Sequence, residues 1–189
     1  MIEQIKEKVT EKLKHHKKRL QHVFGVYETA VKLAKIHGVD EKKVAIAALY
    51  HDYSKYDTIE EQIQYLDLKS IKEYVDYPVI YHALSAAAQL EYDFKIRDKE
   101  ILNAIKYHVW GRPNMTDIEK IIFISDSCEP NRKFKDCDMI YEMATKDLDL
   151  AVEHCMKISI EHVYKKQLTP SEEQFGAYAY YKEVNSGKT

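Results

Sequence analysis

Apolar residues recur along this chain at intervals of three and four positions, the spacing that gathers them on one face of an α-helix. Residues 1–18 show the pattern first and predict an N-terminal amphipathic helix, with an apolar face formed by Ile2, Ile5, Val9, Leu13 and, beyond this range, Leu20. A second helix is predicted to end at Gly38, because glycine readily adopts the left-handed conformation of a helix C-cap. Residues 40–52 are apolar around most of the helical circumference, which predicts a central helix buried on more than one side.

Three short polar motifs predict further helix starts. Residues 57–60 (Asp-Thr-Ile-Glu) and 116–119 (Thr-Asp-Ile-Glu) match the capping box, in which a polar side chain and a carboxylate reciprocally satisfy free backbone N–H groups. The third motif, 169–172, places Pro170 at the first helical position and predicts a C-terminal helix over residues 169–189.

Helical periodicity also covers residues 77–94, 99–109, 117–128 and 138–166, and the alternation typical of strands is nowhere sustained. Five glycines and four prolines in 189 residues leave little material for the tight turns of a sheet-rich protein. We therefore predict an all-α fold, a helical bundle organised as a single domain over residues 1–189.

The composition is that of a soluble globular protein, since 45% of the residues are hydrophobic and 32% are charged. No apolar run is long enough to cross a bilayer and the N-terminus lacks the apolar centre of a signal peptide, so we expect a cytoplasmic protein with no membrane partner. The net charge of −2 argues against a nucleic-acid polymer as partner. Three cysteines without a C-x-x-C pair indicate neither a disulfide framework nor a zinc-thiolate site.

The candidate chemistry lies in polar residues that interrupt or end the apolar helices. These residues are His22, His51, Asp52, His82, His108 and Asp126. A buried imidazole or carboxylate without a partner is strongly destabilising, and a shared metal ion would satisfy all of them together. Nitrogen and oxygen donors without thiolates suit iron, manganese, cobalt or zinc, and suit magnesium less well.

Histidines also have a purely structural interpretation. A lone histidine on an apolar helix face more often hydrogen-bonds to the backbone than it binds a metal, and we apply this to His37, His154 and His162. His15 and His16 lie in the polar opening helix and are expected to be exposed. The His51-Asp52 doublet is by itself a weak signal, and a metal site is favoured by the ordered set of ligand types in separate helices.

Three motifs surround members of this set: H-D-x-x-K at 51–55, H-x-x-G-R-P at 108–113 and D-x-x-E-P-x-R at 126–132. Together with the order H…HD…H…H…D, they resemble the HD-domain superfamily of metal-dependent phosphohydrolases, and within it the bacterial YqeK type, which hydrolyses diadenosine tetraphosphate symmetrically to two ADP. The resemblance covers residues 22–132 and implies a helical HD domain. Val109 and Trp110 stand where the family commonly has small residues, and residues 82–88 match the family less closely.

The resemblance implies a role for each residue of the set. A principal metal ion, with iron favoured, would be held by His22, His51, Asp52 and Asp126. A second metal position or a phosphate contact would be provided by His82 and His108. The catalytic residues would be Asp52, Lys55, His82 and His108. The residues themselves add further candidates, because cations neutralise the charge that develops on phosphoryl oxygens. Lys55, Arg112 and Arg132 suit this role, and Arg19, one helical turn before His22, is a further candidate. The predicted substrate-binding residues are therefore Arg19, Lys55, His82, His108, Arg112 and Arg132.

The favoured prediction is hydrolysis of a dinucleoside tetraphosphate to ADP by attack of metal-activated water on phosphorus. Two cations have structural alternatives: Arg112 could brace a loop, and Arg132 could pair with Glu129 or Asp136. At the level of function, a nucleotidase acting on monophosphates, a di-iron HD-domain oxygenase and a non-catalytic nucleotide sensor stay open. The sequence decides neither whether one or two ions bind nor whether the chain forms a homodimer.

Overall fold

The computed structural model describes residues 1–132 and 136–188, and every regular element within these ranges is a helix. The α-helices are α1 Ile2–Leu13, α2 Lys17–His37, α3 Glu41–Tyr50, α4 Ile59–Ile63, α5 Leu68–Glu73, α6 Tyr81–Phe94, α7 Lys99–Lys106, α8 Asp117–Cys128, α9 Cys137–Ala144, α10 Leu148–Lys165 and α11 Glu172–Asn185. A 3-10 helix, η1, covers Pro78–Ile80 directly before α6. The predicted all-α fold is confirmed.

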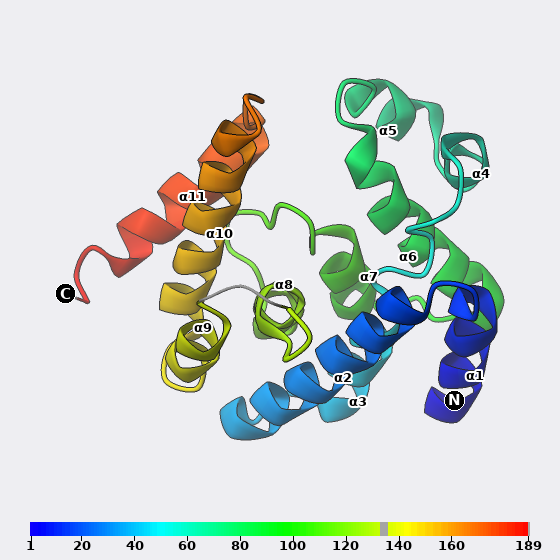
Figure 1. The fold of residues 1–189 in the computed structure, drawn as a ribbon, viewed down its shortest axis with the longest axis horizontal. Coiled ribbons are helices and arrows are strands. Elements are labelled where there is room, and N and C mark those ends of the chain that lie inside the picture. Colours follow the sequence, from blue (N-terminus) through cyan, green and yellow to red (C-terminus); the bar gives the residue numbers. More distant parts are fainter. Residues whose placement is uncertain (133–135, 189) are drawn as a thin grey trace.

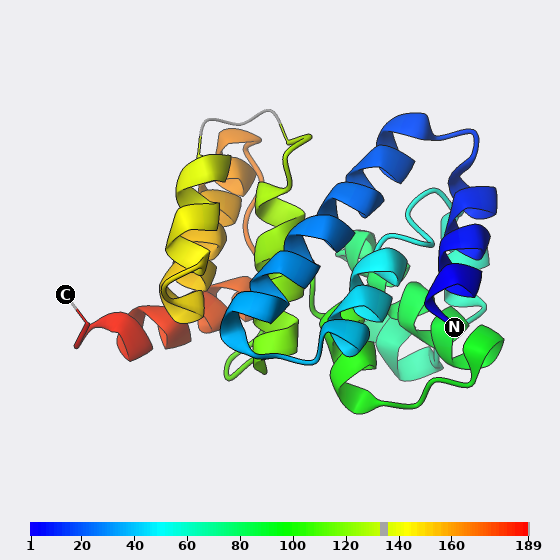
Figure 2. The same cartoon turned by 90° about the horizontal axis from the view of Figure 1, so that it is seen from below.

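The helices form two groups with α7 and α8 between them (Figure 1). The C-terminal helices α9, α10 and α11 lie on one side, and α1, α4, α5 and α6 lie on the other. The pair α2 and α3 lies below α7 and α8 in Figure 1, and Figure 2, which is seen from below, shows the two helices side by side. Both helices pack against α8. A continuous hydrophobic core extends from Ile5 in α1 to Tyr181 in α11.

The described part of the chain contains no helix long and apolar enough to cross a membrane. The single-domain organisation over residues 1–189 stays a prediction. The last residue of the predicted C-terminal helix, Thr189, lies outside the described residues.

The central helix has the environment that its apolar sequence predicts. Residues 44–50 of α3 are all buried, and Asp40 caps the helix by accepting hydrogen bonds from the backbone N–H groups of Lys42 and Lys43. The preceding helix α2 ends at Gly38, as predicted, with a φ of 67° in the left-handed region. Because α3 packs against α1, α2, α7 and α8, the His51-Asp52 doublet follows a helix that is held on several sides.

The opening helix is shorter than the apolar spacing predicts. Residues 1–18 do not form one helix, because a break at residues 14–16 separates α1 from α2, and Leu20 belongs to α2. At this break the ring of His16 stacks on Tyr56 with 3.8 Å between the ring centroids.

The predicted helix over residues 138–166 is divided into α9 and α10. Asp147 stands at the division, where its carboxylate accepts hydrogen bonds from the backbone N–H groups of Asp149 and Leu150 and caps α10. A short polar side chain that binds nearby N–H groups favours a new helix start over continuation. The spacing of apolar residues does not show where such a cap competes with continuation of the helix.

The capping motif before α4 is shifted by one residue from the prediction. The N-cap is Thr58, and its reciprocal partner is Glu61. Asp57 instead forms an ion pair with Lys12, with 2.5 Å between the carboxylate oxygen and the ammonium nitrogen. The predicted role of Asp57 as a cap is therefore wrong.

The other two motifs also differ in detail. Thr116 caps α8 as predicted, but the Glu119 carboxylate binds the Arg112 guanidinium. The final helix begins with a capping box between Ser171 and Gln174, so Pro170 lies before the helix and not at its first position. Residues 169–171 are consequently outside α11.

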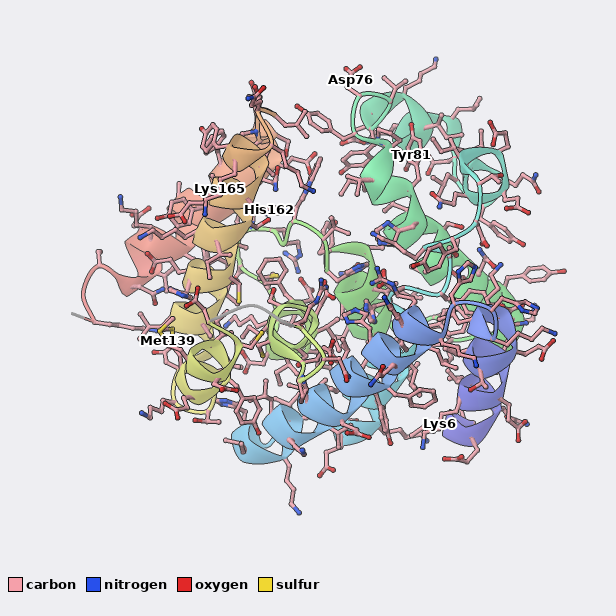
Figure 3. The ribbon with its side chains drawn as sticks, viewed as in Figure 1. Lys6, Asp76, Tyr81, Met139, His162 and Lys165 are labelled. Carbon is pink, nitrogen blue, oxygen red and sulfur yellow. The ribbon has the colours of Figure 1, made fainter. Side chains whose placement is uncertain are left out.

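Replacing Asp40 with alanine is expected to lower the free energy of unfolding by about 1 kcal/mol, because two N–H groups of α3 lose their acceptor. Urea denaturation followed by circular dichroism measures the change. Asp76→Ala is the control, because Asp76 is exposed beyond α5 (Figure 3) and its carboxylate forms no hydrogen bond or ion pair with the described residues. Equal losses in the two variants would contradict the prediction.

Candidate metal centre

Six polar side chains from different parts of the chain converge on one another. His22 lies in α2, His51 and Asp52 follow α3, His82 is in the first turn of α6, His108 follows α7, and Asp126 lies in α8. Their ligand atoms form two groups, each with all atoms within 4.8 Å of one another: His22, His51, Asp52 and Asp126 in one, and Asp52, His82 and His108 in the other. The structure thus brings together all six residues that the sequence singled out.

Asp52 belongs to both groups because the chain turns directly after α3. The Tyr53 N–H donates to the Tyr50 carbonyl, so the backbone curls at the doublet instead of continuing as a straight helix. One carboxylate oxygen of Asp52 lies 3.4 Å from His51 Nε2, and the other lies 3.3 Å from His82 Nε2. A single buried carboxylate therefore faces both halves of the cluster.

The four histidines share one orientation. The Nδ1 atoms of His51, His82 and His108 lie 2.6–2.7 Å from the backbone carbonyls of the residues three positions earlier. The Nδ1 atom of His22 lies 3.0 Å from the Glu129 carboxylate. Because these oxygens only accept hydrogen bonds, each Nδ1 carries the ring proton and donates a hydrogen bond. Each neutral ring then turns the lone pair of Nε2 toward the cluster.

The cluster fits a divalent transition metal. The Nε2 atoms of His22 and His51 are buried and have no hydrogen-bond partner, a situation that costs about 1–3 kcal/mol for each polar group. A cation placed among imidazole nitrogens and carboxylate oxygens would satisfy these lone pairs. Such a donor set suits iron, manganese, cobalt or zinc.

The buried groups have protonation states that suit metal binding. Burial would raise the pKa of Asp52, but the neighbouring His51, His108 and His82 rings hold this pKa well below its usual range. Burial likewise opposes ionisation of Asp126, whose pKa is nevertheless held low by His22 and Arg132. Burial lowers the pKa of His82 to about 4, so this ring is neutral near pH 7.

Three of the predicted phosphate-binding cations reach the cluster. Arg19 forms an ion pair with Asp52, with 2.5 Å between Nη1 and the carboxylate oxygen. Arg132 donates hydrogen bonds to the carboxylate of Asp126 at 2.7 Å and to the backbone carbonyl of Asp126 at 2.9 Å. Lys55 Nζ lies 3.3 Å from His82 Nε2, and burial lowers the pKa of this lysine.

Arg112 is placed elsewhere. Its Nη2 lies 2.8 Å from the buried carboxylate of Glu119, and its guanidinium lies over the Tyr107 ring. This contact matches the loop-bracing alternative. Arg132, by contrast, pairs with Asp126 and not with Glu129 or Asp136.

Trp110 is buried next to this loop. Its ring makes edge contacts with Tyr74 and Tyr77, at centroid distances of 6.1 and 5.2 Å. The unusual Val109-Trp110 pair therefore joins the segment after α7 to the segment around η1, which leads into His82.

The remaining histidines lie outside the two groups. His37 Nε2 lies 2.7 Å from the Ala144 carbonyl, as expected for a structural histidine. His15, His16 and His162 are exposed, and His154 is half-buried.

Glu129 belongs to the site, whereas its place in the sequence indicated only a partner for Arg132. Its side chain is almost completely buried, with 1% exposure, and it accepts hydrogen bonds from His22 Nδ1 and from the backbone and side-chain nitrogens of Asn131. Gly25, one turn after His22, leaves room for it: a Cβ atom there would lie within 3 Å of the Glu129 carboxylate. Because a glycine inside a helix lowers stability, Gly25 could have indicated from the sequence that another group approaches α2 closely at this position.

Replacing Glu129 with alanine is expected to weaken the affinity of the cluster for a divalent transition metal by about tenfold to hundredfold, because His22 loses the acceptor that orients its ring. Competition with a chromophoric chelator measures the affinity. Glu142→Ala, an exposed position in α9, is the control. An unchanged affinity in the folded Glu129→Ala protein would show that Glu129 does not position His22.

Comparison with known proteins places this geometry in a family. The HD domain family model matches residues 19–131, a range that contains all six residues of the cluster. The symmetrical bis(5'-nucleosyl)-tetraphosphatase of Bacillus subtilis (strain 168) is 37% identical over 160 residues, which cover 84% of this chain and 85% of that protein. The protein of the same name from Staphylococcus aureus (strain NCTC 8325 / PS 47) is 36% identical over 184 residues, covering 95% of this chain and 94% of that protein.

A solved structure agrees with this placement. The crystal structure of a predicted HD superfamily hydrolase involved in NAD metabolism from Clostridium acetobutylicum matches with a TM-score of 0.89 at 32% identity, and the match covers 97% of this chain and 98% of that chain. Family model, relatives and fold lead to the same conclusion: this chain belongs to the HD-domain family.

Proposed function

We propose that this protein hydrolyses dinucleoside tetraphosphates, and diadenosine tetraphosphate in particular, symmetrically to two nucleoside diphosphates. The observation that carries the proposal is the convergence of four Nε2 atoms and two carboxylates in a buried cluster with two unsatisfied imidazole nitrogens. Three relatives named symmetrical bis(5'-nucleosyl)-tetraphosphatase, at 36–38% identity, support the choice of substrate.

The proposal assigns the metal to the cluster residues. His22, His51, Asp52 and Asp126 are proposed as the ligands of one ion, and Asp52, His82 and His108 as a second ion site or a phosphate contact. A bound divalent metal lowers the pKa of its water and offsets charge on the phosphoryl oxygens. Asp52 keeps a negative charge at neutral pH and so serves both halves of the cluster.

The cations around the cluster are proposed to bind the tetraphosphate. Arg19 and Arg132 each have a planar fork that can share its donors between a carboxylate and a phosphate oxygen. Lys55 lies beside His82 and would place its ammonium on a phosphate at that end of the cluster. Arg112 is paired with buried Glu119 and is proposed to support the loop instead of the substrate.

Iron is the metal that we propose, ahead of manganese, cobalt and zinc. The donor set of four imidazoles and two carboxylates is compatible with all of them, and the resemblance of the motifs to the YqeK type favours iron. Cytoplasmic location stays a prediction of the sequence, and a homodimer stays an open alternative.

Incubation of the metal-loaded protein with diadenosine tetraphosphate is expected to yield two ADP, measured by anion-exchange chromatography. Asp52→Asn is expected to lower kcat by about a thousandfold, because the negative charge that Asp52 supplies to both groups of metal ligands is lost while the shape of the side chain is kept. Asp76→Asn, an exposed position, is the matched control. ATP and AMP as products, or release of phosphate from nucleoside monophosphates only, would contradict the proposal.

Removal of metal with a chelator is expected to abolish hydrolysis, and ferrous iron added without oxygen is expected to restore more activity than manganese, cobalt or zinc. Because the metal is expected to bind the folded chain and not the unfolded chain, it should also raise Tm. The shift in Tm should grow with metal concentration. Metal analysis of the protein as isolated and thermal melting measure both effects. If another metal restored more hydrolysis than iron, iron would be rejected as the metal of this site. Full activity in the chelated protein would reject a metal-dependent mechanism.

A further inference from the structure

A cavity of about 480 Å³ lies between α8, α9 and α10, outside the six residues of the cluster. This volume is within the range of roughly 300–1,000 Å³ that is usual for small-molecule sites. Its described lining includes Arg132, Ile140, Cys155, Ile158, Ser159 and Lys165. Lys165 lies on α10 close to His162, which also lines the cavity (Figure 3).

Arg132 lines this cavity and also contacts the cluster. Its side chain lines the cavity, while its Nη2 lies 2.7 Å from the Asp126 carboxylate. The two sites also meet on α8, where Asp126 faces the cluster and its neighbour Ser127 lines the cavity. Successive helical residues point about 100° apart, so the two sites lie on adjoining faces of one helical turn.

The wall of the cavity suits a nucleoside. Ile140 and Ile158 offer aliphatic surface, and burial raises the pKa of the Cys155 thiol to about 12, so this side chain is uncharged near pH 7. Such a wall fits the apolar faces of a purine, whereas the hydroxyl of Ser159 and the carboxylate of Glu161 offer hydrogen bonds to its polar edge or to ribose. Lys165 and Arg132 supply positive charge for an attached phosphate.

We propose that this cavity is the subsite for one nucleoside of the dinucleotide, with Arg132 binding the phosphate chain where it passes from the cavity to the cluster. The inference rests on the proposed function for its substrate. It adds the residues of α10 and α9 to the substrate site, although they lie outside the range matched by the family model. The residues of α10 that line the cavity would then discriminate a nucleotide from a bare polyphosphate.

Ser159→Trp is the test, because the added indole would fill part of the cavity. ADP affinity, measured by isothermal titration calorimetry on the metal-loaded protein, is expected to fall about tenfold. Inhibition of hydrolysis by inorganic tripolyphosphate, which has no nucleoside, is expected to stay unchanged. Lys157→Trp is the matched control, because Lys157 is exposed on α10 and lines a different hollow with His154.

A second pair of variants covers the case in which Ser159→Trp does not fold. Lys165→Glu reverses an exposed charge in the cavity, and Lys157→Glu makes the same change outside it. Only Lys165→Glu is expected to weaken ADP binding and to raise KM for diadenosine tetraphosphate.

The outcomes separate the two proposals. Unchanged ADP affinity in folded Ser159→Trp and Lys165→Glu would overturn the subsite. An equal loss of ADP and tripolyphosphate binding in Ser159→Trp would also overturn it, because it would indicate damage to the cluster. Failure of the unmodified protein to hydrolyse diadenosine tetraphosphate would instead reject the proposed function, because the ADP titration does not depend on turnover.

Discussion

The hydrogen bond from each histidine Nδ1 to an oxygen of the protein is the interaction on which the site depends. It selects the tautomer and holds the ring, so that Nε2 faces the cluster with a lone pair. For His51, His82 and His108 the acceptor is a carbonyl three residues earlier, near a helix end or at the junction of η1 and α6. Carbonyls at the C-terminal end of a helix lack partners within the helix, so those near the ends of α3, η1 and α7 are available to a side chain that follows.

His22 lies in the first turns of α2 and uses a different acceptor. Its partner Glu129 is 107 residues away in the sequence and is fully enclosed between α2 and the end of α8. Gly25 permits this approach, since any side chain there would collide with the carboxylate. The packing of α2 against α8 therefore has a direct chemical consequence, because it supplies the oxygen that orients the fourth imidazole.

Charge is balanced locally around the cluster. Asp52 and Asp126 are each paired with an arginine, Arg19 and Arg132, which lie closer to solvent than the carboxylates they contact. Neighbouring histidines at both carboxylates, and Arg132 at Asp126, hold the pKa of each carboxylate low, and the two arginines place cations where a polyphosphate would enter. Arg132 also lines the neighbouring cavity, so one side chain links the metal ligands to the proposed nucleoside subsite.

Apolar periodicity was enough to predict the helical fold and the burial of α3, and residue type with order along the chain was enough to select the six cluster residues. These features are local, as are the three carbonyl acceptors. The breaks before α2 and α10 escaped prediction because caps such as Asp147 compete with apolar spacing. Only the tertiary structure decided that Glu129 orients His22, that Arg112 pairs with Glu119, and that Arg132 stands between cluster and cavity. The contact of Glu129 with His22 and the place of Arg132 depend on how α8 packs against α2 and α10, and helix packing sets distances that spacing along one helix does not contain. Arg112 and Glu119 are only seven residues apart, but an irregular loop joins them, and no helical spacing predicts its path.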